Sequence, residues 1–129
     1  MEKALSNITV LDLTRVLAGP YCTMMLADYG ANVIKIEMPG KGDDTRAMGP
    51  KKNDYSMYYA YVNRGKKGIT LNLKSEEGKK LFLEMVKKAD VVVENYRPGV
   101  MDKLGVGYDV LKELSLIHIS EPTRLALIS

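Results

Sequence analysis

Residues 8–37 read ITVLDLTRVLAGPYCTMMLADYGANVIKIE, and this stretch decides the fold that the sequence predicts. Residues 8–13 and 31–37 are short runs rich in β-branched and aliphatic residues, which is typical of buried strands. Between them, Pro20 suits the first position of a helix, because its missing N–H would have no partner there. Gly30 is the expected left-handed cap of that helix. The stretch therefore predicts strand, helix and strand, the crossover that pairs two strands in parallel.

The same alternation continues along the chain. Residues 68–74 alternate between polar and apolar and predict a third strand, and residues 90–96, with three consecutive valines, predict a fourth buried on both faces. Ser75 is the expected N-cap of the helix between them. The apolar stripe expected on that helix consists of Leu81, Phe82, Met85, Val86 and Ala89. We therefore predict an α/β fold, a Rossmann-like open parallel sheet with flanking helices.

Two segments do not follow the simple alternation. Residues 43–67 are polar and rich in tyrosine, and we expect a long excursion with some local order, its tyrosines packed against the sheet edge or a partner subunit. After a turn at residues 97–99, a helical pattern begins, is broken at residues 105–107 and resumes toward Leu114.

Composition excludes several classes of protein. The chain has 129 residues, 46% of them hydrophobic and 27% charged, which is typical of a globular protein. Its net charge of +3 is dispersed in lysine pairs, which we expect on solvated surface, so a nucleic-acid partner is not indicated, although a small polyanion is compatible. We find neither an apolar run long enough to span a membrane nor a signal peptide, and we expect a cytoplasmic protein with no membrane partner.

Several common kinds of site are not supported. No Cys/His cluster suggests zinc, and neither a Walker loop nor a Gly-x-Ser-x-Gly elbow occurs, so we expect no metal cofactor. Cys22, the single cysteine, lies in an apolar run and is expected in the core. Glu37 follows Gly19 by 18 residues, as a ribose-binding acid would in an NAD site, but the other glycines of that motif are missing.

The carboxyl ends of the predicted strands are the expected ligand site, because open parallel sheets bind ligands there. Segments 15–20, 38–42, 71–75 and 95–99 each follow a predicted strand. Their cations and hydrogen-bonding groups, with one residue a helical turn further on, are Arg15, Lys41, Lys74, Asn95, Arg97 and Lys103.

Four motifs, in this order, resemble one known family: VLDLTRVLAGPYCTMMLADYGANVIKIE, GKGDDTR, NRGKKGITLNLKS and VVVENYRPGVMDKLGVGY. They are similar to the amino-terminal part of the family III CoA-transferases, a group that includes formyl-CoA and carnitine CoA-transferases and the related α-methylacyl-CoA racemases. The resemblance covers about residues 5–113. It implies that coenzyme A is the bound substrate and acyl carrier.

The resemblance also implies which residues line the coenzyme A site. They follow strands one, three and four, with one basic position beyond: Leu17, Ala18, Leu71, Asn72, Leu73, Lys74, Asn95, Tyr96, Arg97 and Lys103. In relatives a basic residue often follows the second strand, and Met38 stands there in this chain.

Transfer chemistry in the resembling family uses an aspartate that attacks an acyl-CoA and passes CoA to a carboxylic acid through covalent intermediates. No aspartate of this chain matches that motif, so we expect no catalytic residue here and expect the nucleophile beyond it. The family fold is two interlocked rings, which implies a homodimer for the full-length parent. We expect the isolated chain to be inactive and to bind CoA weakly or not at all.

Residues 114–124, LSLIHISEPTR, depart from the family pattern and look like a sequencing adapter translated in frame. We therefore expect residues 1–113 to be the amino-terminal CoA-binding portion and residues 114–129 to be a non-native tail. Two other functions stay open: an acyl-CoA racemase or epimerase, whose continuation would carry a proton-transfer pair, and a stand-alone nucleotide-binding module.

Overall fold

The computed structural model describes residues 1–114 and 118–120. Its elements, in chain order, are β1 (Thr9–Asp12), α1 (Ala18–Asp28), β2 (Asn32–Glu37), the 3₁₀ helix η1 (Asp44–Ala47), β3 (Lys51–Lys52), β4 (Tyr55–Ser56), α2 (Met57–Val62), β5 (Lys67–Thr70), α3 (Glu76–Val86), β6 (Val91–Val93), α4 (Val100–Lys103), α5 (Tyr108–Leu114) and β7 (His118–Ser120). Strands and helices alternate, as the sequence predicts.

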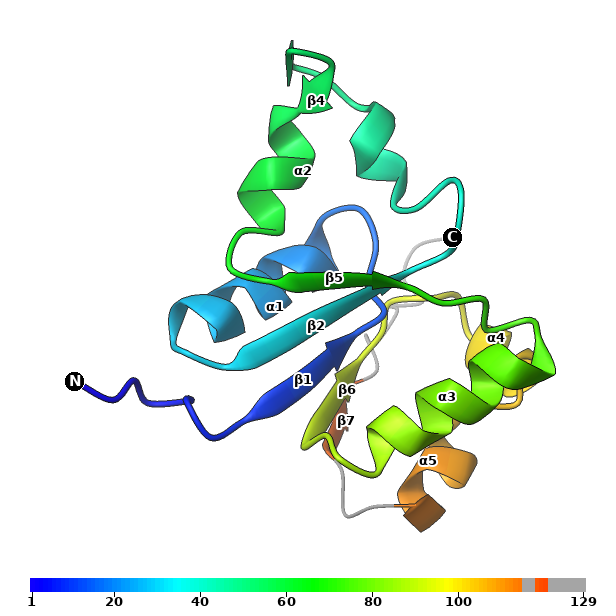
Figure 1. Cartoon of the computed structure of the whole chain (residues 1–129). Helices are drawn as coiled ribbons and strands as arrows, with labels where there is room; N and C mark the ends of the chain where they lie inside the picture. The colour runs from blue at the N-terminus through cyan, green and yellow to red at the C-terminus, as the bar shows by residue number, and fades with distance from the viewer. Residues whose placement is uncertain (115–117, 121–129) are drawn as a thin grey trace, which may run out of the picture.

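The main sheet has five strands in the order β5-β2-β1-β6-β7 (Figure 1). Every pairing in it is parallel, and Val10 of β1 lies opposite Val33 of β2 and Val91 of β6. The predicted class, an α/β fold with an open parallel sheet and flanking helices, is confirmed.

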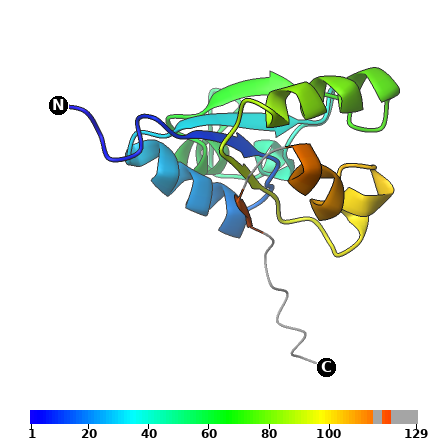
Figure 2. The same cartoon turned by 90° about the horizontal axis from the view of Figure 1, so that it is seen from below.

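The helices cover both faces of this sheet. The crossover from β1 to β2 and the crossover from β5 to β6 run in opposite directions along the sheet, so right-handed connections put α1 and α3 on opposite faces (Figures 1 and 2). Phe82 and Val86 of α3 pack with Leu11 on one face, and Val10 and Val33 pack with α1 on the other. Among the described residues, no helix is long and apolar enough to cross a membrane.

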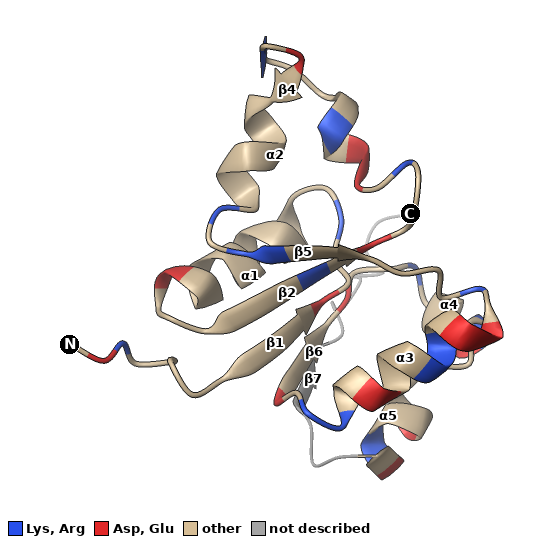
Figure 3. Ribbon diagram, viewed as in Figure 1, with Lys and Arg blue, Asp and Glu red and all other residues tan. Residues whose placement is uncertain are grey.

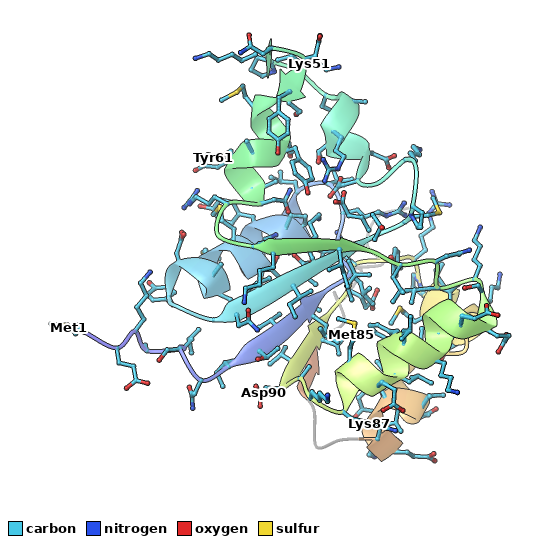
Figure 4. All side chains as sticks on the ribbon, viewed as in Figure 1. Met1, Lys51, Tyr61, Met85, Lys87 and Asp90 are labelled. Carbon is cyan, nitrogen blue, oxygen red and sulfur yellow. The ribbon has the colours of Figure 1, made fainter. Side chains whose placement is uncertain are left out.

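The polar excursion forms a small projection above the sheet, made of η1, the antiparallel β3–β4 hairpin and α2 (Figure 1). Ser56 caps α2 by accepting a hydrogen bond from the N–H of Tyr59. Tyr59 is buried, whereas Tyr61 is exposed and its side chain points outward; Lys51 lies at the tip (Figure 4). The expected local order is therefore present, and it centres on one tyrosine.

Two predicted strands are longer than the observed ones. The third ends at Thr70, because the carbonyl of Asn72 accepts hydrogen bonds from the N–H and hydroxyl of Ser75 and turns the chain out of the sheet. Leu71 and Leu73 still alternate, and Leu73 still reaches the core, so a strand-like pattern extends beyond the strand. The fourth ends at Val93, where side-chain hydrogen bonds replace the ladder.

Other local expectations were wrong. α1 begins at Ala18, so Pro20 is its third residue, although it still lies in the first turn. Cys22 is exposed rather than buried in the core, because the buried face of α1 is formed by Thr23 and Met24. Leu81 is also exposed; the other residues of its predicted stripe are buried or, like Met85, pack against the core (Figure 4).

The predicted boundary at residues 113 and 114 stays a prediction. Residues 118–120 form β7, paired with β6 so that His118 lies opposite Val91. Residues 115–117 and 121–129, which complete the expected non-native tail, lie outside the described residues.

Gly78 fixes the junction between the third strand and α3. An added Cβ at this position would lie 1.9 Å from the carbonyl oxygen of Asn72. Ser75 closes the same junction by accepting a hydrogen bond from the N–H of Gly78 at 3.0 Å. The first turn of α3 therefore packs directly on the backbone of residues 71–74.

We expect Gly78→Ala to lower the free energy of unfolding by about 1–3 kcal/mol, because backbone must move to admit the methyl group. Gly68→Ala is the matched control, since an added Cβ there meets nothing within 4 Å. Urea unfolding followed by far-UV circular dichroism measures both. Equal midpoints for the two variants would contradict the expectation.

Candidate functional site

Two pockets open at the carboxyl ends of the parallel strands. The larger, of about 430 Å³, lies between the segments that follow β2, β5 and β6, and its walls include Met38, Leu73 and Val100. The smaller, of about 250 Å³, is lined by residues 15–18 with Asp44 and Asn95. Arg15 lines both, so the two pockets adjoin along one side chain.

The strand-end residues predicted from the sequence divide between these pockets. The larger pocket brings together Leu71, Asn72, Leu73, Lys74, Tyr96 and Arg97. The smaller one brings together Leu17, Ala18 and Asn95. Within the described part of the chain, Lys41 and Lys103 line neither pocket, and Lys41 instead pairs with Asp44 on the surface.

The loop that follows β1 is held at three successive residues by hydrogen bonds to side chains. The N–H of Thr14 donates to Asp12 at 2.9 Å, and its carbonyl accepts from Lys35 at 3.0 Å. The N–H of Val16 donates to Asp43 at 3.3 Å. Between them, Arg15 is bonded on both sides of its backbone by Asn95. The backbone that separates the two pockets is therefore fixed by side chains.

This loop contains an unusual backbone conformation. Val16 has φ of 70°, a region that costs an L-residue about 1–2 kcal/mol and is disfavoured further for a β-branched side chain. Such strain persists only where the surroundings determine it, and it concentrates at functional sites. Here the Asp43 carboxylate supports this conformation of Val16 by accepting a hydrogen bond from its N–H.

Two buried ion pairs lie beneath the loop. Lys35 and Asp43 approach to 2.9 Å with side chains 1% and 0% exposed, and Lys66 meets Asp12 at 2.9 Å with 2% and 0% exposed. Burial alone would raise the pKa of Asp43, but hydrogen bonds from Thr45 and Lys35 lower it below its usual range. Burial lowers the pKa of Lys66, and Asp12 partly opposes that effect. Lys66 thus contradicts the expected surface position of the lysine pairs.

A third cluster joins the projection to the end of β2. Arg46 donates to both oxygens of Glu37, at 3.0 and 2.6 Å, and lies over the ring of Tyr59. The phenol of Tyr59 donates to the same carboxylate at 3.1 Å. Burial alone would raise the pKa of Glu37, but Arg46 and the Asp43 N–H lower it overall. Glu37 lines the larger pocket with its charge already compensated.

Unpaired cations surround the larger pocket. Arg15, Lys74 and Arg97 line it, and none of the three forms an ion pair within the described residues. The Arg15 guanidinium lies 5.2 Å from the ring centre of Tyr96. Burial raises the pKa of Tyr96, so its phenol stays neutral. The pocket therefore combines apolar walls, one aromatic ring and positive charge.

Sequence reasoning missed the groups that support the site from below. Asp43 begins the predicted polar excursion and Lys35 lies inside a predicted strand, and neither position by itself indicates a role in the site. A signal was present, because a lysine between isoleucines in a buried strand needs an anionic partner. Figure 3 shows a basic position on β2, a strand that has a neighbouring strand on each side. Among the described residues, no group of three His, Cys, Asp or Glu could hold a metal ion.

A family model described as CoA-transferase family III matches residues 5–119. The chain belongs to CoA-transferase family III. An acetyl-CoA:oxalate CoA-transferase of Acetobacter aceti is 56% identical over 116 residues, which cover 88% of this chain and 30% of that protein. A succinyl-CoA:glutarate CoA-transferase of Homo sapiens is 50% identical, with coverage of 88% and 26%.

Solved family structures have the same fold. A CAIB/BAIF family protein from Brucella suis superimposes with a TM-score of 0.87 at 38% identity, covering 94% of this chain and 33% of that one. A hypothetical protein from Mycobacterium tuberculosis gives 0.85 at 40% identity, with coverage of 92% and 33%. The family III chain described here therefore spans about a third or less of the length of the relatives it matches.

We expect Lys35→Met to lower the free energy of unfolding by about 3–5 kcal/mol, because it leaves the Asp43 carboxylate buried without its cation. The double variant Lys35→Met with Asp43→Asn should regain part of that loss. Lys41→Met is the matched control, because Lys41 pairs with the adjacent Asp44 at 2.8 Å but both are exposed; its cost should stay below about 1 kcal/mol. Urea unfolding of the parent and the three variants measures these losses. Equal losses in Lys35→Met and Lys41→Met would contradict a buried pair.

Stability should fall on acidification. The folded-state pKa values of Asp43 and Glu37 lie below their usual values, so their contribution is complete above an unfolded pKa of about 4 and is lost as the pH falls through the folded values. Urea midpoints measured from pH 7 to pH 3 should be level at first and then decline. The urea midpoint of the Lys35→Met, Asp43→Asn variant should decline less steeply, whereas that of Asp54→Asn, at an exposed position, should follow the parent. Identical declines in the parent and both variants would refute Asp43 as a source of the acid sensitivity.

Proposed function

We propose that this chain supplies part of the coenzyme A site of a CoA-transferase, which moves CoA between an acyl-CoA and a carboxylic acid. The observation that carries the proposal is the larger pocket, with its apolar walls, its aromatic ring and three cations that form no ion pair with any residue the structure describes. Coenzyme A has matching parts, an adenine ring and several phosphates. Family membership supports the same assignment.

The proposed contacts come from both pockets. Leu71, Asn72, Leu73, Lys74, Tyr96 and Arg97 would meet the nucleotide in the larger pocket. Leu17 and Ala18 form the start of α1, which has no acidic residue in its first turn and no side-chain cap, so its N-terminal dipole favours an anion. Asn95 lies beside them, and the resemblance adds Lys103.

The charges of the site agree with an anionic ligand. Glu37 and Asp43 also line the larger pocket, and uncompensated carboxylates there would repel phosphates. Arg46 and Lys35 neutralise them, so the cations at the rim dominate the local field. Arg15 can reach phosphates in either pocket, because it lines both.

In the same proposal, residues outside this chain carry out the chemical step. The attacking aspartate would lie beyond these residues, and the chain alone would bind without transferring. The whole protein would act on acyl-CoA and carboxylic acid substrates, as a homodimer, in the cytoplasm. Relatives named as CoA-transferases at 43 to 56% identity support the transferase over the racemase.

Titration of the ¹⁵N-labelled chain with CoA, followed by NMR, tests the proposal. We expect weak binding, with amide shifts concentrated in residues 71–74 and 96–97, and displacement by adenosine 3′,5′-bisphosphate. Lys74→Ala combined with Arg97→Ala should weaken binding and reduce its salt dependence, because fewer phosphate contacts remain. Lys112→Ala, on α5, should change neither. Shifts confined to other regions, or none at saturating CoA, would refute the proposed site.

A further inference from the structure

The side-chain amide of Asn95 forms two hydrogen bonds with the backbone of Arg15. Its Oδ1 accepts the N–H of Arg15 at 2.9 Å, and its Nδ2 donates to the Arg15 carbonyl at 2.7 Å. The last backbone bond between β1 and β6 runs from the Leu13 N–H to the Val93 carbonyl at 2.9 Å. Beyond that bond, the Asn95 side chain makes the next link between the two chain segments. It extends the β1–β6 pairing by one step without a backbone partner.

This link sets the direction in which the Arg15 side chain leaves the backbone. With both backbone groups of Arg15 bonded, its Cα–Cβ direction is set, and the guanidinium lies 5.2 Å from the ring centre of Tyr96, the residue after Asn95. Arg15 also lines both pockets. Asn95, Arg15 and Tyr96 form one unit built across two strand ends.

We infer that Asn95 is a positioning residue, which acts on the bound nucleotide through Arg15 and not through a contact of its own. This inference rests on the proposed coenzyme A site and refines it, since Asn95 lines the smaller pocket and would otherwise count as a ligand contact. Its acceptor and one donor are engaged with Arg15. With one N–H of the amide left over, the role that its two observed hydrogen bonds support is to hold Arg15 in phosphate-binding geometry before the ligand arrives, which reduces the entropy lost on binding.

A double-mutant cycle separates the two roles. Arg15→Ala keeps the backbone that Asn95 binds but removes the guanidinium. We expect Asn95→Ala and Arg15→Ala each to weaken CoA binding about tenfold, and the double variant to bind no more weakly than Arg15→Ala. If the two effects multiply to about a hundredfold, Asn95 contacts the ligand itself and the inference is overturned.

Two further chains control the cycle. Arg64→Ala removes another arginine that lies 5.2 Å from a tyrosine ring, that of Tyr61, outside both pockets, and CoA affinity should not change. Asn95→Leu keeps the volume and adds no charge but loses both hydrogen bonds to Arg15, and it serves if Asn95→Ala does not fold. It should weaken binding in the parent and have no further effect beside Arg15→Ala; an additional loss there would overturn the inference.

A measurement without ligand distinguishes this inference from the proposed function. The Tyr96 ring should shift the side-chain NMR resonances of Arg15, and Asn95→Ala or Asn95→Leu should remove that shift as Tyr96→Leu does. Unchanged Arg15 resonances would overturn the positioning role even if CoA binds. If the parent chain binds no CoA, the proposed site fails and the nucleotide role of Asn95 fails with it. Loss of the ring shift in the Asn95 variants would still establish that Asn95 holds the Arg15 side chain beside the Tyr96 ring.

Discussion

The buried ion pair between Lys35 and Asp43 is the constraint on which the candidate site depends. A charge placed in the middle of a sheet costs several kcal/mol unless its partner and its remaining hydrogen bonds are all supplied. Lys35 meets this condition with the Asp43 carboxylate and the Thr14 carbonyl. Asp43 meets it with Lys35, Thr45 and the Val16 N–H. Since every one of these groups must be in place together, the pair admits one arrangement of the loop.

That arrangement explains why a strained loop can be stable. An apolar pair of similar volume could pack equally well under the sheet, but it would offer nothing to the N–H of Val16. The ion pair ties the loop after β1 to β2, because Asp43 bonds both Lys35 and Val16. Asn95 ties the same loop to the end of β6. Loops of this kind are preorganised, because the cost of ordering them is met during folding and not during binding.

The sequence predicts the frame of this structure better than its details. Periodicity predicted the four main-sheet strands of residues 1–113, and Gly30 and Ser75 marked helix boundaries, because these signals depend on local conformation. The predicted ends of the third and fourth strands were wrong, since the side chains of Asn72 and Asn95 accept backbone N–H groups in place of ladder bonds, which no period reveals. The exposure of Cys22 depends on which face of α1 meets the sheet, and an apolar run does not specify that face.

The candidate site shows the same division between local and non-local information. The strand-end rule placed Arg15, Lys74 and Arg97 near one another, because topology alone brings the ends of parallel strands together. It could not show that Asn95 faces a backbone and not a ligand, because that depends on a partner 80 residues away in the chain. Residue type at a strand end therefore identifies the neighbourhood of a site, whereas the hydrogen bonds that a side chain has already made decide whether it remains available to a ligand. By that criterion the cations of the larger pocket, which form no ion pair among the described residues, have more capacity left for a polyanion than the amide beside them, which keeps a single N–H.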